Sequence, residues 1–242
     1  MTHDVVELSK AMIRIQSVSH QSNGPISDYI QAWLDENGFV TERLTYIDPE
    51  GVEKVNIVGQ RGSGKGGLAF FGHSDTVPGQ PEQWPAFDPE VRDGRLFGRG
   101  SCDMKGQIAA SMIAAAQADL SKLTQPVFVV VAADEETGGY GVRQVADESK
   151  LMAASETRYG VIIEPTESIP VYAHKGVGQV KVTAHGSAAH TSTAKGVSAN
   201  FLIAPFMAEM AAYADELLTD PSYQNDEFSP PSNGFNMRIN DG

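Results

Sequence analysis

Three apolar runs in this sequence each lead directly into side chains that can bind metal ions. Residues 68–71 lead to His73, residues 126–133 to Asp134, Glu135 and Glu136, and residues 161–163 to Glu164. Short continuous apolar runs are typical of strands buried on both faces of a parallel sheet. Because the carboxyl ends of parallel strands meet at one edge of the sheet, we expect these side chains to share a crevice. The sequence therefore predicts an α/β protein with a mostly parallel central sheet.

Helices that could flank this sheet are indicated by apolar residues at helical spacing. We predict helices over residues 5–15, 25–37, 104–116, 140–151 and 199–218, and strands over residues 40–46 and 55–60.

The composition fits a soluble globular protein. The 242 residues are 41% hydrophobic and 20% charged, with a net charge of −13 that argues against nucleic-acid or anionic-membrane partners. The N-terminus has no basic region followed by a long apolar run, so we expect a cytoplasmic protein. The single cysteine, Cys102, excludes an internal disulfide and a cysteine-cluster zinc site.

A glycine-rich segment, GQRGSGKGG at residues 59–67, resembles two nucleotide-binding motifs. Both motifs require a helix directly after the loop, whereas residues 68–71 are predicted as a strand. The phosphate loop also requires Ser or Thr after its lysine, and Gly66 stands there. We therefore interpret the segment as a hairpin loop that does not bind phosphate.

His73 is the first candidate metal ligand. Asp75 follows two residues later, where its carboxylate can accept the other imidazole N–H and fix the tautomer. A single histidine at a strand end is more often structural, so this interpretation depends on the acidic residues of the neighbouring strand ends. Carboxylates gathered in one crevice must take up protons or share cations. An imidazole with carboxylates and no thiolate favours a hydrolytic zinc, cobalt or manganese site over a structural zinc.

Three further acidic residues complete this hypothesis. Asp103 precedes a predicted helix, and its two carboxylate oxygens could bridge two metal ions. Neighbouring side chains of an extended backbone point in different directions, so Glu135 and Glu136 cannot reach the same ion. We assign Glu136 to the metal and Glu135 to the attacking water, as the general base that later protonates the leaving amine. The alternative for this pair is a solvated acidic turn before a helix.

Four motifs, GHSDTVP, GRGSCDMKG, ADEETGG and IIEPT, resemble in their order and spacing the M20 family of zinc-dependent amidohydrolases and exopeptidases. The resemblance implies a zinc exopeptidase-like fold with two Zn²⁺ ions per subunit, for which Co²⁺ can substitute. It implies His73, Asp103 and Glu164 at one ion, Asp103 and Glu136 at the other, Glu135 as general base and Asp75 behind His73. It also implies a cis peptide bond after Asp103.

The same resemblance divides the chain into two domains. Residues 1–174 resemble the metal-binding catalytic domain, and residues 175–242 resemble an inserted α+β lid or dimerisation domain, with strands over 175–184 and 235–239. The family's motif histidine falls on His190, which would reach the other subunit's site in a homodimer and stabilise the tetrahedral oxyanion. We interpret the nearby His185 as a strand-end residue.

Relatives in this family resume the catalytic domain after the lid and there supply a further histidine for the second ion. The 242 residues contain no such segment, so we expect either a fragment of a longer protein or a naturally short one. This form should bind at most one zinc ion tightly and have little amidase activity.

The expected function is metal-dependent hydrolysis of the amide bond of an N-acyl amino acid. HKG at residues 174–176 and EPT at residues 164–166 resemble the deacetylase and desuccinylase branch of the family most closely. Two alternatives stay open: a dipeptidase or carboxypeptidase acting on a short peptide, and an inactive metal-binding or dimerising fragment.

Overall fold

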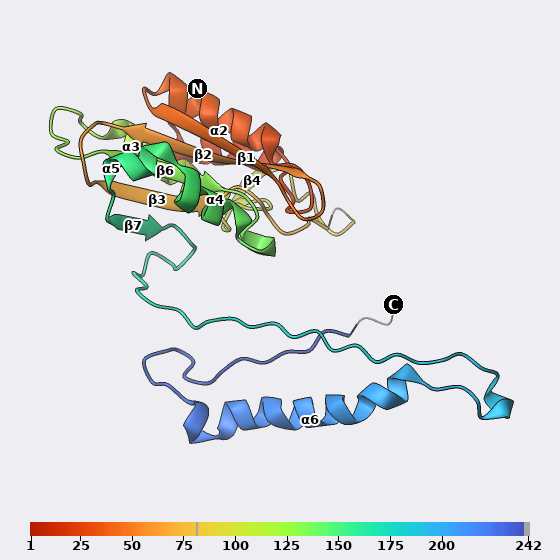
Figure 1. The fold of residues 1–242 in the computed structure, drawn as a ribbon. Helices are drawn as coiled ribbons and strands as arrows, with labels where there is room; N and C mark the ends of the chain where they lie inside the picture. Colours follow the sequence, from red (N-terminus) through yellow and green to blue (C-terminus); the bar gives the residue numbers. More distant parts are fainter. Residues whose placement is uncertain (81, 240–242) are drawn as a thin grey trace. The chain divides into compact units, whose positions relative to one another are not determined.

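The structure is a computed structural model that describes residues 1–80 and 82–239. The chain divides into two compact units, Met1–Ile169 and Pro170–Gly242, which we describe one at a time. The first unit contains a five-stranded sheet with helices on both faces, and the described part of the second contains one long helix and extended segments (Figure 1). The assignment of these units as catalytic domain and lid stays a prediction.

The central sheet brings together strands that are distant in the sequence. Its spatial order is β1 (Val40–Ile47), β2 (Glu53–Arg61), β6 (Val127–Ala132), β3 (Leu68–His73) and β7 (Tyr159–Ile162). β2 is antiparallel to β1 and β6, whereas β3 is parallel to β6 and β7. Only β2 therefore runs against the other four strands, which confirms the predicted mostly parallel sheet. His73 pairs with Ala132, so β3 and β6 end side by side.

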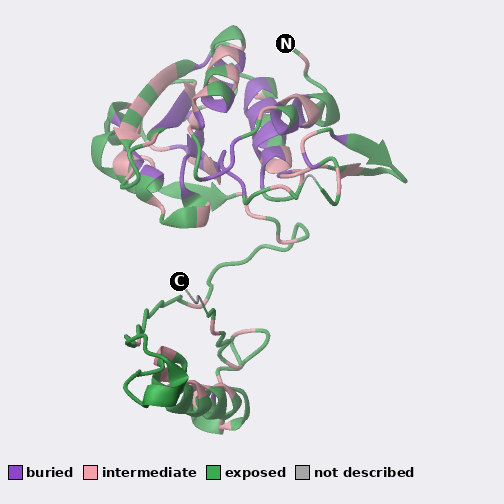
Figure 2. Cartoon of the chain, turned by 90° about the vertical axis from the view of Figure 1, so that its right-hand side faces the viewer, coloured by how far each residue is buried: buried purple, intermediate pink, exposed green. Residues whose placement is uncertain are grey.

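Helices cover both faces of the sheet because its central strands are apolar on both sides. One face is covered by α1 (Val5–Arg14), α2 (Gly24–Glu36) and α3 (Lys105–Gln117), and the other by α4 (Tyr140–Glu148) and α5 (Lys150–Ser155). Val129 and Val131 of β6 join the larger core, whereas Phe128 and Val130 join the smaller one. Successive side chains of a strand point to opposite faces, which accounts for the continuous apolar run. The buried residues of the first unit gather between these layers (Figure 2).

One connection and one helix in the first unit differ from the prediction. The glycine-rich residues 59–67 link β2 to β3, but β6 lies between these strands, so the segment is a crossover and not a hairpin loop. The helix predicted over residues 140–151 is two helices, α4 and α5. Ser149 separates them because its side chain caps α5 by accepting the Met152 N–H.

The connection between β3 and α3 contains a hairpin that the sequence analysis did not predict. Its strands are β4 (Glu90–Arg92) and β5 (Arg95–Phe97). The two turn residues, Asp93 and Gly94, have φ angles of 51° and 71°. Positive φ at both positions is characteristic of the type I′ turn that closes two-residue hairpins.

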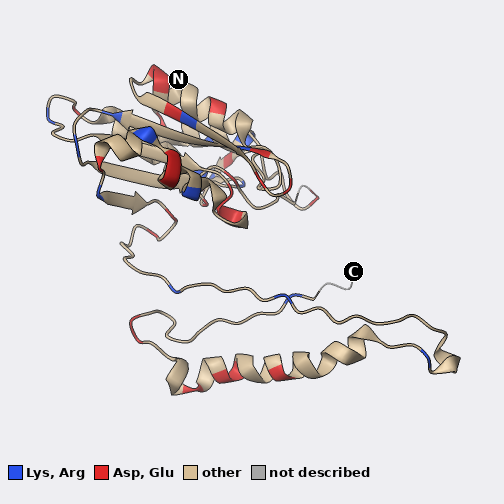
Figure 3. Cartoon of the chain, viewed as in Figure 1, with Lys and Arg blue, Asp and Glu red and all other residues tan. Residues whose placement is uncertain are grey.

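The second unit is built around α6 (Ala199–Thr219), which confirms the helix predicted over residues 199–218. Ser198 caps its N-terminus by accepting the Phe201 N–H. Every charged residue of α6 is acidic (Figure 3). The helix is therefore not of the basic type that attracts nucleic acids or anionic membranes. Within the described residues, no helix is both long enough and apolar enough for a bilayer crossing.

The strands predicted over residues 175–184 and 235–239 are wrong for the described part of the second unit. The β pairing found there is one isolated bridge, between Ser187 and Val197. A strand is stable only when a neighbouring strand satisfies its backbone groups, and the alternating segment has none among the described residues of this unit. Val177 and Val180 are accordingly 92% and 90% exposed. The strand component of the predicted α+β lid is thus missing from the described residues.

Candidate metal centre

The predicted site residues of the first unit follow the carboxyl ends of three parallel strands. His73 is the last residue of β3, Glu135 and Glu136 form the short helix η1 (Glu135–Thr137) after β6, and Glu164 follows β7. Asp103 lies two residues before the start of α3. Because β6, β3 and β7 are neighbours and run in the same direction, these segments meet at one edge of the sheet.

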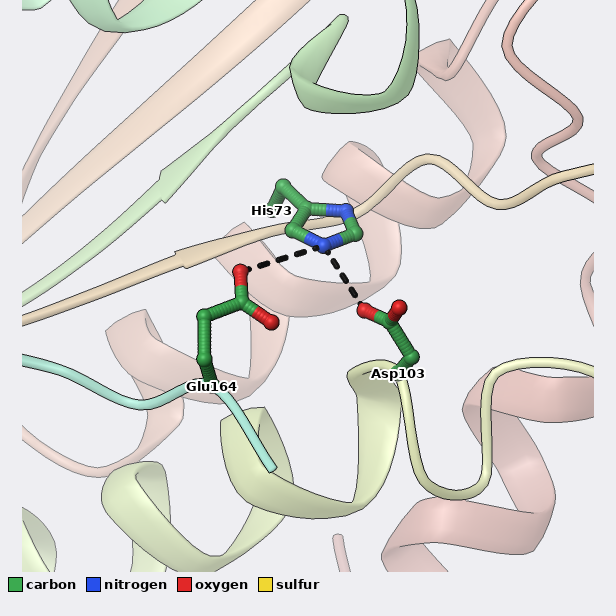
Figure 4. Close-up of side chains that lie close together, drawn as sticks. All are labelled: His73, Asp103 and Glu164. Carbon is green, nitrogen blue, oxygen red and sulfur yellow. Dashed lines mark hydrogen bonds and ion pairs between the residues drawn. The ribbon is translucent and has the colours of Figure 1, made fainter. Parts of the chain in front are cut away.

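His73, Asp103 and Glu164 lie close enough together to hold one ion. Each offers a ligand atom, and these atoms all lie within 4.8 Å of one another. Figure 4 shows His73 Nε2 facing both carboxylates, 3.0 Å from Asp103 Oδ1 and 3.6 Å from Glu164 Oε1. One imidazole with two carboxylates is a donor set that suits a hydrolytic zinc ion and leaves a position for water. The three residues therefore fit the predicted metal.

The charges of this cluster favour a cation. Burial lowers the pKa of His73, but the hydrogen bond with Asp75 and the charges of Asp75, Glu164 and Asp103 outweigh it and raise that pKa to about 9. Burial and the charge of Asp103 raise the pKa of Glu136 and of Glu164, although His73 acts in the opposite direction on both. Raised carboxyl pKa values mark crowded negative charge that a divalent cation would relieve.

Asp75 lies behind His73, although the acceptor nearest to Nδ1 is its backbone carbonyl oxygen and not the carboxylate that the sequence analysis expected. His73 Nδ1 is 2.9 Å from the Asp75 carbonyl oxygen and 3.4 Å from its Oδ1. Both residues are buried. Burial raises the pKa of the Asp75 carboxyl. Hydrogen bonds and the charge of His73 have a larger, opposite effect, so the pKa lies below its usual range. Asp75 therefore stays ionised, as an orienting group for the imidazole must.

The same carboxylate also holds the glutamate turn. The Glu135 N–H donates to Asp75 Oδ1 at 3.2 Å and the Glu136 N–H donates to Oδ2 at 3.3 Å. Ser19 Oγ donates to Oδ2 at 2.8 Å. Ser19 was missed by the sequence analysis because it lies outside every motif and reaches the site only through the fold. Asp75 thus connects the imidazole to the segment carrying Glu135.

The two glutamates occupy different positions relative to His73. Glu135 Oε2 lies 4.0 Å from His73 Nε2, and its side chain is 57% exposed, so water can reach it. Glu136 is outside the group of mutually close ligand atoms found among the described residues. The structure thus brings together three of the four predicted metal ligands.

The remaining predictions concern the backbone after Asp103 and the second unit. The peptide bond between Asp103 and Met104 is cis, as the family resemblance implied. The sequence analysis also gave no role to the buried Met104. Its Sδ accepts the backbone N–H of His73 at 3.3 Å. His190 lies in the second unit and is exposed. Its Nδ1 lies 2.7 Å from Ser192 Oγ, and it caps the short helix η2 (Thr191–Thr193).

Comparison with known proteins gives a family match. Residues 69–234 match the model of Peptidase family M20/M25/M40. The chain is 35% identical to acetylornithine deacetylase of Myxococcus xanthus over 235 residues, which are 96% of this chain and 60% of that protein. It is 36% identical to acetylornithine deacetylase of Pasteurella multocida over 216 residues, 86% of this chain and 54% of the relative. The chain thus spans 54–60% of the length of these relatives.

Solved structures with a related fold are more distant in sequence. Human carnosine dipeptidase 1 aligns with a TM-score of 0.55 and 21% identity, covering 65% of this chain and 37% of that chain. An M20 family metallo-carboxypeptidase of Sulfolobus solfataricus aligns with a TM-score of 0.54 and 18% identity, covering 67% and 37%. At these identities the likeness concerns the fold alone.

Proposed function

The chain belongs to peptidase family M20/M25/M40, and on this premise we propose that it carries the metal centre of a hydrolase cleaving the amide bond of an N-acyl amino acid. The observation that carries the proposal is the convergence of His73, Asp103 and Glu164 with Glu135 beside them. The identity to two acetylornithine deacetylases supports a deacetylase in particular. An N-acetylated basic amino acid is therefore the first substrate to test.

His73, Asp103 and Glu164 would hold a zinc ion, with Asp103 and Glu136 available to a second one. Zinc supplies Lewis-acid chemistry, which polarises the amide carbonyl and lowers the pKa of water in the site. Asp75 keeps the His73 ring in the orientation that leaves Nε2 facing the carboxylates. Cobalt should substitute for zinc because it accepts the same ligands.

Glu135 is the general base of this proposal. Its exposed carboxylate beside His73 takes a proton from the attacking water and returns it to the leaving amine. His190 stabilises the oxyanion of the tetrahedral state in the site of a second subunit, so the proposal includes a homodimer formed through the second unit. The cytoplasmic location stays a prediction.

The test is hydrolysis by the purified protein, including any longer product if the coding sequence continues beyond Gly242. Acetylornithine, succinyl-diaminopimelate and dipeptides are supplied with added zinc or cobalt, and the amine released is measured. We expect acetylornithine to be hydrolysed fastest, a chelator to abolish the reaction, and added metal to restore it. Preference for dipeptides would favour the peptidase alternative. Metal binding without hydrolysis by any form would favour the inactive fragment.

A further inference from the structure

Lys54 is a fully buried lysine on β2 to which the proposed reaction gives no role. Buried ammonium groups are rare unless paired, because transferring a charge from water to the protein interior is energetically costly. The Lys54 Nζ lies 2.9 Å from the buried Asp134 Oδ1 and 3.5 Å from Oδ2 of Asp48, whose side chain is 8% exposed. It also donates to the carbonyl oxygens of Ser19 and Gln21. One ammonium group thus joins three segments of the first unit.

Asp134 is the residue directly before the proposed general base, and its backbone is in the left-handed region, with φ 61° and ψ 29°. This conformation is unfavourable for a residue with a side chain, so surrounding contacts must hold it. Its carbonyl oxygen accepts the Gly138 N–H at 3.0 Å and the Gly139 N–H at 2.6 Å. The conformation of Asp134 therefore determines where the turn containing Glu135 begins and closes.

The side chain of Asp134 is held from two directions. Lys54 faces Oδ1, and the Tyr46 hydroxyl on β1 donates to Oδ2 at 2.6 Å. Burial and the contact with Asp134 raise the pKa of Tyr46, so the hydroxyl stays protonated and remains a donor. An Asp134 carboxylate without these partners would be a buried, unpaired charge. Without these partners the Asp134 side chain would turn toward water, and the left-handed backbone conformation would no longer be fixed.

Lys54 also reaches the other side of the turn through Ser19. Its Nζ donates to the Ser19 carbonyl oxygen, while Ser19 Oγ donates to Asp75 Oδ2. Asp75 in turn accepts the N–H groups of Glu135 and Glu136. The first residue of the turn, Asp134, is therefore held through its own side chain, and the next two residues are held by Asp75. Both attachments lead to the same ammonium group.

We propose that Lys54 and Tyr46 are positioning residues for the general base, acting through Asp134 to hold the turn that presents Glu135 beside His73. This inference rests on the proposed function for its link to catalysis. The clamp itself involves no metal or substrate, so it can be tested apart from hydrolysis. Neither residue lies in any of the four sequence motifs.

The first measurement is amide hydrogen exchange by NMR in the chelator-treated protein. Tyr46→Phe removes one hydroxyl without changing the shape of the ring. We expect exchange at the Glu135 and Glu136 amides to become about tenfold faster, as for the loss of one hydrogen bond to a charged group. The amides of Val129 and Val131 in β6 report on global unfolding and should be accelerated by no more than this factor, because the lost hydrogen bond destabilises only the folded state. Tyr29→Phe, which removes a hydroxyl on α2, is the matched control.

Lys54→Met should have a larger effect, about a hundredfold at the same two amides, because it removes the charge paired with Asp134. If this variant does not fold, Tyr46→Phe decides the question alone. Three results would overturn the proposal: Glu135 and Glu136 amides already unprotected in the unmodified protein, no change at these two amides in Tyr46→Phe, or an equal change at them in Tyr29→Phe.

The second measurement separates positioning from general stability. In zinc-loaded protein, Tyr46→Phe should lower kcat about tenfold with KM and zinc content unchanged, because the base is displaced while substrate and metal sites remain. A rise in KM or a loss of zinc instead would overturn the link to Glu135. If no form of the protein, including any longer product, shows zinc-dependent hydrolysis, the proposed function fails, and the exchange experiment still decides whether the clamp exists.

Discussion

The Asp75 carboxylate lies 3.4 Å from His73 Nδ1, on the side of the ring opposite the nitrogen that faces Asp103 and Glu164. We expect this carboxylate and the Asp75 carbonyl oxygen, 2.9 Å from the same nitrogen, to fix the imidazole tautomer and strengthen the ring as a metal ligand. Asp75 also accepts two backbone N–H groups of the glutamate turn. The position of the metal ligand and that of the proposed base are therefore coupled through one side chain.

Asp75→Asn should lower zinc affinity by about ten- to a hundredfold, the range found for orienting partners of metal-bound histidines. The amide carries no charge, and it has one acceptor oxygen where the carboxylate has two, so one N–H of the turn loses its partner. Competition with a chromophoric chelator measures the affinity. Asp28→Asn, at an exposed residue paired with Arg43, is the control and should bind zinc normally. Equal affinities in the two variants would contradict the role of Asp75.

Glu135→Gln should abolish amide hydrolysis, with a fall in kcat of about a hundredfold or more, while zinc content stays near that of the unmodified protein. The amide keeps the shape of the side chain but cannot accept a proton from water. Turnover and zinc content are measured on the same preparation. Parallel loss of zinc and activity would identify Glu135 as a ligand and not as the base.

His190→Ala should lower kcat by about a hundredfold in a form of the protein that turns over, as for other lost oxyanion donors, and should leave zinc binding intact. His185→Ala is the matched control, since it removes a neighbouring histidine to which we assign no catalytic role. Unchanged turnover in His190→Ala, or an equal loss in His185→Ala, would remove His190 from the proposed mechanism.

Glu42 should stabilise the first unit in a pH-dependent way. From β1 its carboxylate accepts Ser149 Oγ at 2.6 Å and the N–H groups of Lys150 and Leu151 at 2.9 and 3.3 Å, which caps α5. Burial raises the pKa of Glu42, but these hydrogen bonds outweigh it and lower the pKa below its usual value. The unfolded chain therefore binds more protons, so this contribution is present above the unfolded pKa and is lost as pH falls through the folded pKa.

Glu42→Gln should accordingly lower the free energy of unfolding at pH 7 by about 0.5–1 kcal/mol, the lower part of the range for helix caps, because Glu42 is partly exposed. Urea unfolding of both proteins between pH 7 and pH 4 measures this difference. It should shrink as the pH falls below about 4.5. A difference that stays constant over this range would show that the carboxylate charge is not what stabilises the cap.

The sequence predicted the parts of the fold that depend on local signals. The apolar runs before His73 and Glu164 gave the strand ends, and hence the edge at which the metal ligands meet. The Asp93–Gly94 hairpin was missed because its strands are only three residues long, too short for a clear pattern, and half of their residues are charged. Its turn residues carried the available signal. The crossover of residues 59–67 was misread because sequence proximity of two strands does not establish that they pair.

The network around the site was less predictable than the ligands themselves. A candidate ligand at a strand end is identified by its residue type and position, as for His73 and Glu164. Lys54 lies just outside the strand predicted over residues 55–60, and its importance arises from contacts with segments far along the chain. Ser19 and Asp134 reach it only after the sheet has formed. Such contacts depend on strand order, which local patterns do not specify.

The central claim is that His73, Asp103 and Glu164 form a zinc site, and metal analysis after desalting tests it most directly. The 242-residue chain should retain one zinc ion, because these three residues form a complete set of protein ligands. His20→Ala, which removes an exposed histidine of the same unit, should retain as much zinc, and His73→Ala should retain less than about a tenth. Zinc retained by His73→Ala, or two tightly held ions in the unmodified chain, would contradict this account.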